Sequence, residues 1–143
     1  MKILEVLTRR RAIGNLGERR AARYLFLRGY RILKRNYVAG GYEIDIIAKK
    51  GDTIAFCEVK TRNADQHSNI EPRPASAVTP EKQRKIISAA AGFKGYEYKG
   101  LKLRFDIIEV YYESRDGRDR VTRIKHLIGA FDKNSAYSKP WER

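Results

Sequence analysis

The chain has 143 residues, of which 42% are hydrophobic and 34% charged, and its formal net charge is +14. This length suits one domain with a single hydrophobic core, and the composition excludes a disordered chain. There is no run of about 18 apolar residues, no signal-peptide pattern and only one cysteine, Cys57. We therefore expect a cytoplasmic protein without a membrane span.

Positive charge is concentrated near the N-terminus. Residues 1–35 hold 11 basic and 2 acidic side chains. A basic surface binds polyanions because their counterions are released. We expect a nucleic acid, DNA in the first instance, as the partner; an anionic membrane surface is the main competing interpretation. The side chains expected to contact the nucleic-acid backbone are Arg9, Arg10, Arg11, Arg19, Arg20, Arg23, Lys82 and Lys85.

The first predicted element is a helix over residues 16–28, preceded by a basic segment over residues 1–13. Asn15 is a favourable N-cap, Glu18 stands three residues later as in a capping box, and Gly29 follows the end. Glu18 also falls on the apolar face of the helix. It is therefore either a capping residue or an inward-facing carboxylate that needs a partner.

Three β-strands are predicted next. The first covers residues 30–37, and the other two, over residues 42–50 and 53–62, are rich in β-branched and aromatic side chains. A tight turn at Gly51 joins the second strand to the third. We place Lys50 and Gly51 in the loop, which fixes the pairing of the two strands.

That pairing brings two acidic side chains together. Asp45 faces Phe56 and Glu43 faces Glu58, so Asp45 and Glu58 are diagonal neighbours within about 7–8 Å. Lys60 shares their face because side chains alternate along a strand. A register change of one residue would separate them.

The second half of the chain is predicted to complete the fold. A long polar loop over residues 62–78, expected to be mobile, leads to a helix over residues 80–91. Strands follow over residues 101–112, which is apolar on both faces and so central, and over residues 121–127. The expected fold is α/β, with a mixed central β-sheet flanked by helices.

We assign residues 1–131 to one domain and residues 132–143 to a loose C-terminal tail. Two other polar groups have open interpretations. Asp106, in an apolar strand, either supports a site or pairs with a nearby basic group. Cys57 is expected to be a buried core thiol rather than a nucleophile.

The strongest chemical signal is the combination of Asp45, Glu58 and Lys60. Two neighbouring carboxylates repel each other unless a cation joins them, and oxygen ligands suit Mg²⁺ or Mn²⁺. Glu18 could complete the metal site, and Lys60 could orient a water or stabilise charge on phosphorus. The competing interpretation is a solvated strand face with a weak surface ion pair between Glu43 and Lys60.

Several longer motifs resemble one family. The motifs are GNLGERRAARYL, RGYRILKRNY, YEIDIIAKKGDTIAFCEVKTR, AVTPEKQRKI, RFDIIEV and IKHLIGAF. In this order they resemble the bacterial YraN family, whose fold is similar to archaeal Holliday-junction resolvases and other PD-(D/E)XK nucleases. Tyr42 stands where that family usually has Gly.

The resemblance implies a restriction-endonuclease-like (PD-(D/E)XK) core. It also implies a catalytic set formed by Glu18, Asp45, Glu58 and Lys60, with Gln83 or Lys82 assisting from the following helix. Of these, Glu18, Asp45 and Glu58 would hold the metal.

Three hypotheses of function follow. The first is a Mg²⁺- or Mn²⁺-dependent nuclease, acting on structured or branched DNA. The second is a nucleic-acid-binding protein that keeps the fold but does not cleave. The third is a protein-assembly module. The oligomeric state is open, and a homodimer is compatible with the sequence.

Overall fold

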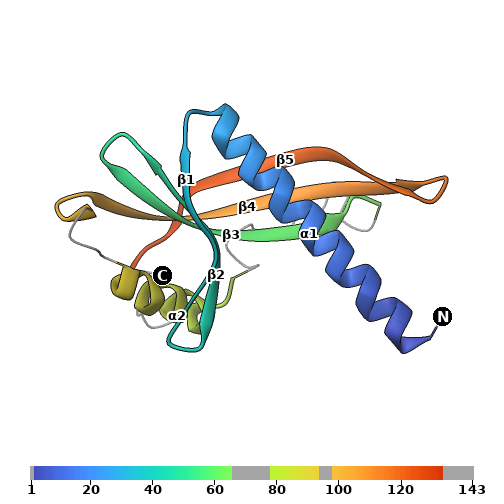
Figure 1. The fold of residues 1–143 in the computed structure, drawn as a ribbon, viewed down its shortest axis with the longest axis horizontal. Coiled ribbons are helices and arrows are strands. Elements are labelled where there is room, and N and C mark those ends of the chain that lie inside the picture. The colour runs from blue at the N-terminus through green and yellow to red at the C-terminus, as the bar shows by residue number, and fades with distance from the viewer. Residues whose placement is uncertain (1, 66–77, 94–97, 134–143) are drawn as a thin grey trace, which may run out of the picture.

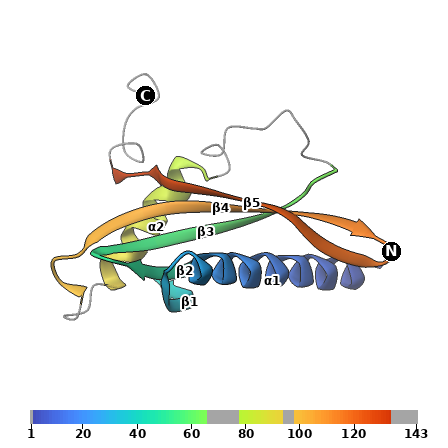
Figure 2. The ribbon, with the colours of Figure 1, turned by 90° about the horizontal axis from the view of Figure 1, so that it is seen from above.

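The computed structural model describes residues 2–65, 78–93 and 98–133, which form a five-stranded sheet with one helix on each face (Figures 1 and 2). The elements in chain order are α1 (Ile3–Leu27), β1 (Arg31–Ala39), β2 (Tyr42–Lys50), β3 (Thr53–Asn63), α2 (Pro80–Phe93), β4 (Lys102–Arg115) and β5 (Arg118–Phe131). Within these ranges, no helix is both long and apolar enough to cross a membrane.

The sheet is mixed. Its strand order is β1-β2-β3-β4-β5, and all neighbours are antiparallel except β3 and β4, which run parallel. β4 has partners on both sides and is buried from Asp106 to Tyr112, as expected of a central strand. The predicted α/β class with a mixed sheet is confirmed, and the arrangement is compatible with a restriction-endonuclease-like core.

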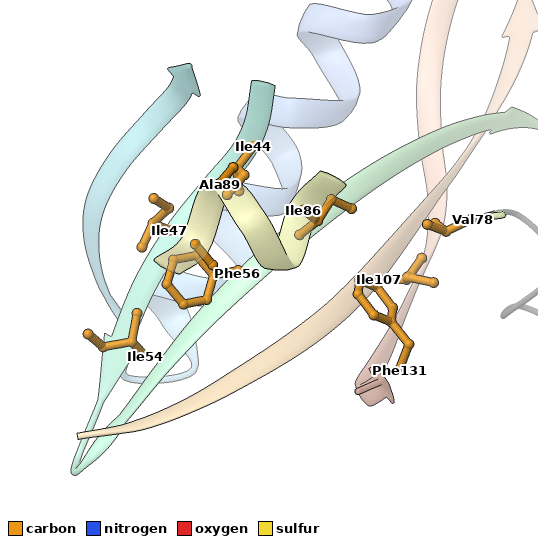
Figure 3. Close-up of a cluster of buried hydrophobic side chains, with 10 residues drawn as sticks. Ile44, Ile47, Ile54, Phe56, Val78, Ile86, Ala89, Ile107 and Phe131 are labelled. Carbon is orange, nitrogen blue, oxygen red and sulfur yellow. The ribbon is translucent and has the colours of Figure 1, made fainter. Parts of the chain in front are cut away.

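Two separate cores lie on the two faces of the sheet. On one face, Ile86 and Ala89 of α2 pack over Ile47, Phe56 and neighbouring apolar side chains (Figure 3). On the other face, Ala21 and Leu25 of α1 pack on a cluster formed by Tyr30, Ile46, Ala48, Ala55, Cys57, Ile108 and Val110. The alternation of side chains along each strand therefore divides the sheet residues between the two helices.

The predicted start of α1 is wrong. The helix begins at Ile3, so Asn15 and Glu18 lie inside it and do not form an N-cap. Glu5 lies in the first turn, where its carboxylate accepts a hydrogen bond from Lys2 N–H at 3.3 Å. From Ile3 onward, the basic segment is thus part of α1.

Near its N-terminus, α1 contacts the hairpin between β4 and β5. Arg9 ties the two together: it pairs with Asp119 at 3.0 Å and donates to Ser114 Oγ at 3.0 Å. These contacts are exposed, so they orient the helix more than they stabilise it.

The predicted hairpin register is wrong by two residues. Lys50 pairs with Thr53, so the two-residue turn is Gly51-Asp52, and Gly51 has φ of +60°, which suits glycine. The observed pairing of Ile46 with Cys57 extends to place Asp45 opposite Glu58. A shift of two preserves the face of every side chain, so the predicted shared face of Asp45 and Glu58 does not depend on this error.

The later elements agree with the sequence in type and differ in length. Thr79 caps α2, because its Oγ1 accepts a hydrogen bond from Lys82 N–H at 3.2 Å. β3 continues to Asn63, into the region predicted as a loop. Most of that loop, residues 66–77, lies outside the described residues, so its mobility stays a prediction.

Asp106 is fully buried and pairs with a nearby basic group, as one of its two interpretations predicted. Its carboxylate accepts two hydrogen bonds from Arg104 at 2.9 and 2.8 Å, one from Gly129 N–H at 2.9 Å, and lies 2.8 Å from His126 Nε2. These contacts hold the pKa of Asp106 below its ordinary value, although burial opposes them. The network fastens β5 to β4 behind α1.

Glycine at position 17 sets the distance between α1 and the sheet. A Cβ built on Gly17 would lie 1.9 Å from Thr61 Oγ1 and 2.9 Å from Thr61 Cβ, so rotating the threonine would not relieve the clash. A Cβ on Gly14, one turn earlier, would meet nothing within 4 Å. The helix can therefore approach β3 closely only at Gly17.

We predict that Gly17→Ala destabilises the protein by about 1–3 kcal/mol, because α1 must move away from β3. Gly14→Ala is the matched control and should stabilise by about 0.5–1 kcal/mol through helix propensity alone. Urea denaturation of both variants checks this. Equal effects of the two substitutions would show that the Gly17 contact does not set the helix position.

Candidate metal and catalytic site

The site forms where β2 and β3 separate. Their pairing runs from Lys50–Thr53 to Ile46–Cys57. One step further, Asp45 Oδ2 accepts a hydrogen bond of 2.7 Å from Val59 N–H. A side-chain carboxylate thus takes the role that a main-chain carbonyl would have in a continuous ladder.

The alternation of side chains along β2 breaks at Asp45. Ile44 belongs to the α2-facing core, whereas Ile46, two residues away, belongs to the α1-facing core. In a regular strand both would point to the same face. Asp45 therefore lies at a local twist, where it can approach groups from both sides of the sheet.

From the α1 side, three carboxylates converge. Ligand atoms of Glu18, Glu43 and Asp45 all lie within 4.8 Å of one another. Asn36 of β1, with φ of +53°, joins them: with its NH₂ group turned toward the acids, it donates to Glu18 Oε2 at 3.2 Å and to Glu43 Oε1 at 2.9 Å. The inward-facing interpretation of Glu18 agrees with this position.

From the α2 side, Glu58 approaches Asp45. Its carboxylate lies 3.6 Å from Lys60 Nζ and hydrogen-bonds to the Tyr42 hydroxyl. The side chains of Glu58 and Lys60 are only 11% and 24% exposed, so they are not a solvated surface pair. Lys82, at the start of α2, adds a positive charge that stabilises the ionised Glu58.

The structure thus brings Glu18, Asp45, Glu58 and Lys60 to one place. It divides them into a group on the α1 side and a group on the α2 side, which the sequence did not predict. Glu43, rather than Glu58, is the third carboxylate in the tight group around Asp45. The predicted register placed Glu43 opposite Glu58 and so concealed this role. Its position two residues before Asp45 on an acidic strand was the available signal.

Burial, together with the charges of neighbouring acids, raises the pKa values of these carboxyl groups. Burial, followed by the charges of Asp45 and Glu43, raises the pKa of Glu18 to about 7. Burial and Asp45 raise the pKa of Glu58 to about 7 against the opposing effect of Lys60. The pKa of Asp45 is also raised, chiefly by burial, although the hydrogen bond from Val59 opposes the shift.

The donor set fits a hard divalent cation. Carboxylate oxygens are the ligands that Mg²⁺ and Mn²⁺ prefer, and a metal would offset the repulsion that raises these pKa values. The pKa values of Glu18 and Asp45 depend on each other, because the two carboxyl groups interact directly. Glu18, Glu43 and Asp45 could hold the ion directly, with Glu58 on the far side of Asp45.

The remaining predicted residues have varied positions. Gln83 is buried, and its Nε2 donates to Val78 O at 2.9 Å, so the amide is turned toward the chain before α2. Its Oε1 is buried without a partner among the described residues. Lys85 makes an exposed pair with Glu81 at 3.6 Å.

Of the predicted nucleic-acid contacts on α1, Arg9 is engaged by Asp119, as described above. Four others are exposed and one is half-buried. The exposed set is Arg10, Arg11, Arg19 and Arg23, and the half-buried one is Arg20.

Residues 17–110 contain all four acids, Lys60 and Gln83, and they match the family described as "Uncharacterised protein family UPF0102". The chain belongs to this family. It is the one that the sequence motifs resemble.

Individual UPF0102 relatives cover most of the chain. A UPF0102 protein of Chlorobaculum parvum is 46% identical over 121 residues, which are 83% of this chain and 91% of that protein. One from Desulfosudis oleivorans is 39% identical over 134 residues, which are 93% of this chain and 100% of that protein. The similarity therefore extends over nearly the full length of both relatives.

We predict that the raised pKa values make stability depend on pH and on divalent cations. Folded Glu18 and Glu58 retain protons up to about pH 7, whereas their ordinary pKa is 4.5. Their contribution to stability is thus full below pH 4.5 and is lost as the pH rises through 7. Without metal, the melting temperature should fall between pH 5 and 8, and Mn²⁺ should raise it more at pH 8.

Thermal melts of Glu18→Gln and Glu58→Gln check this origin, with the exposed Glu81→Gln as the control. The two site variants should show a flatter pH profile and a smaller Mn²⁺ effect than the parent protein. If all three variants kept the pH dependence of the parent protein's melting temperature, Glu18 and Glu58 would not be its cause.

Proposed function

We propose that this UPF0102 protein is a divalent-metal-dependent nuclease that hydrolyses phosphodiester bonds in DNA. The observation that carries the proposal is the convergence of Glu18, Glu43 and Asp45 within 4.8 Å, beside the partly buried pair of Glu58 and Lys60. A cluster of acids with raised pKa values beside a lysine is costly to a fold, and such clusters occur where a cation and a reacting group must be held.

Each group has a distinct role in this proposal. Asp45, together with Glu18 and Glu43, would hold Mg²⁺ or Mn²⁺, and the bound cation would supply Lewis-acid chemistry for hydrolysis of a phosphodiester. Glu58 orients Lys60 through their ion pair. Lys60 in turn stabilises negative charge that develops on phosphorus and positions the attacking water. Tyr42 fixes the Glu58 carboxylate from the other side by its hydrogen bond.

The basic helix supports a polyanionic substrate. Exposed arginines lie along α1, the helix that carries Glu18, and the charge of the whole chain is +14. Such a surface offsets the repulsion between the acidic cluster and phosphate, so substrate can approach before the cation neutralises the site. The sequence holds no base-reading motif, so structured or branched DNA is a suitable substrate class.

We predict different effects of Glu58→Ala, Glu43→Ala and Lys60→Ala. Glu58→Ala should abolish cleavage and weaken Mn²⁺ binding indirectly, because it removes a negative charge close to Asp45, whereas Glu43→Ala should weaken Mn²⁺ binding by removing a ligand. Lys60→Ala should leave Mn²⁺ binding nearly intact, since an ammonium group is not a ligand, and lower cleavage by about a hundredfold. Calorimetry with Mn²⁺ and cleavage of single-stranded, duplex and branched DNA measure these effects.

Glu81→Ala, which removes an exposed carboxylate, should change neither property. Cation binding without cleavage of any of these substrates would favour the alternative of a non-catalytic nucleic-acid-binding protein. Loss of folding in both Glu58→Ala and Lys60→Ala, with no effect of Mn²⁺ on the parent protein, would identify a structural ion pair and overturn the nuclease proposal.

We also predict that DNA binding is mainly electrostatic. The affinity should fall by about a thousandfold between about 50 and about 200 mM salt if about six phosphates are contacted. Fluorescence anisotropy with labelled DNA in EDTA measures this without cleavage. A flat salt response would argue for a protein partner and for the assembly hypothesis.

A further inference from the structure

A hollow lies next to the acidic cluster, where α1 packs on the end of β3. It is an open groove of about 330 Å³ between α1 and the sheet. α1 provides Arg10, Ile13 and Gly14, and the end of β3 provides Val59, Lys60 and Thr61. Tyr112 of β4 completes the lining.

Missing side-chain volume on α1 creates this groove. Gly14 has no side chain, and a Cβ there would meet nothing within 4 Å. One turn later Gly17 lies against Thr61, so the helix is held close to β3 at that end. The groove is therefore open at Gly14 and limited at Gly17.

The lining combines the two properties that a nucleotide requires. Ile13, Val59 and the ring of Tyr112 offer apolar surface for a sugar and a base, and the Thr61 hydroxyl can form a hydrogen bond. Arg10 supplies a cation for a phosphate and is exposed at the groove. Grooves that hold single strands combine basic and aromatic side chains in this way.

The dimensions select an unpaired nucleotide over a duplex. A hollow of about 330 Å³ is at the small end of the range for sites that hold one small molecule. A base pair with both of its backbones cannot enter the space between a helix and the strand on which it packs. One nucleotide, with its base turned inward, can.

The groove is connected to the acids through adjacent residues of β3. Val59 lines the groove with its side chain while its N–H binds Asp45, and Lys60 lines it while pairing with Glu58. A nucleotide in the groove would thus lie against Lys60, the residue that pairs with Glu58.

We propose that the groove between α1 and β3 binds one unpaired nucleotide of the strand to be cut, with its phosphate at Arg10 and its sugar and base against Ile13, Val59 and Tyr112. This inference rests on the proposed nuclease function and narrows its substrate class. The preferred substrate contains a single-stranded nucleotide next to the scissile phosphate, as in a single strand, a flap or a frayed end.

To test this, fluorescence anisotropy measures the binding of labelled single-stranded DNA and of its blunt duplex, both in EDTA. Gly14→Leu fills the groove, and leucine favours the helix more than glycine, so this variant should fold. We expect it to lower the affinity for the single strand by about tenfold or more, in line with the loss of one base contact, and to leave duplex binding within about twofold. Gly14→Ala, whose methyl group meets nothing within 4 Å, should behave as the parent protein.

A second pair of variants separates the groove from general charge. Arg10→Ala and Arg11→Ala each remove one exposed arginine, but only Arg10 lines the groove. Arg10→Ala should lower the affinity for the single strand more than Arg11→Ala does. The two substitutions should lower the affinity for the duplex equally. Comparing the affinities for DNA and for an RNA strand of the same sequence identifies which sugar the groove accepts. The proposal requires that Gly14→Leu lower the affinity for whichever of the two strands binds more tightly.

Equal binding of single strand and duplex, or no effect of Gly14→Leu on either, would overturn the groove proposal and leave the nuclease proposal standing. Groove-dependent binding without cleavage in Mn²⁺ would instead support the groove and overturn the nuclease proposal.

Discussion

The candidate site depends on one backbone amide. Val59 N–H donates to Asp45 Oδ2 at 2.7 Å, just beyond the last paired residues of β2 and β3. This bond satisfies a polar group that strand separation would otherwise leave unpaired. It also fixes Asp45 at the opening between the strands, where Glu18 reaches it from the α1 side and Glu58 from the α2 side. Without it, the acids would belong to two different faces of the sheet.

An opening lined with acids opposes folding, and the surrounding structure compensates for it. Two apolar cores lie on opposite faces of the sheet, and the site lies between the helices that cover them. The buried network of Asp106, Arg104 and His126 holds the far edge of the sheet with fully paired charges. The contrast is instructive, because Asp106 has a lowered pKa among its partners whereas Glu18 and Glu58 have raised ones. The hydrogen-bonded burial of Asp106 stabilises structure, whereas a cluster of acids with raised pKa values is typical of a functional site.

The sequence predicted element types and faces better than lengths and pairings. The proximity of Asp45 and Glu58 could be predicted, because the two-residue register error still leaves them close to each other on neighbouring strands. The start of α1 could not be predicted, because an Asn and a Glu three residues apart resemble a capping box even in the middle of a helix. Glu43 was missed because its position depends on the twist at Asp45, and the groove at Gly14 because it depends on how α1 docks on β3. Both are tertiary features that no local pattern encodes.

The parallel pairing of β3 and β4 has a consequence for the order of events during synthesis. Thr53 pairs with Lys102, so this contact must wait for a long chain segment to close, whereas the β2–β3 hairpin is local. Until β4 arrives, β3 is an exposed edge strand with the apolar run Ile54–Cys57. Such an edge invites pairing with other chains, and charged side chains oppose it. The charged residues Glu58 and Lys60, which follow that run directly, can therefore protect the nascent hairpin from aggregation.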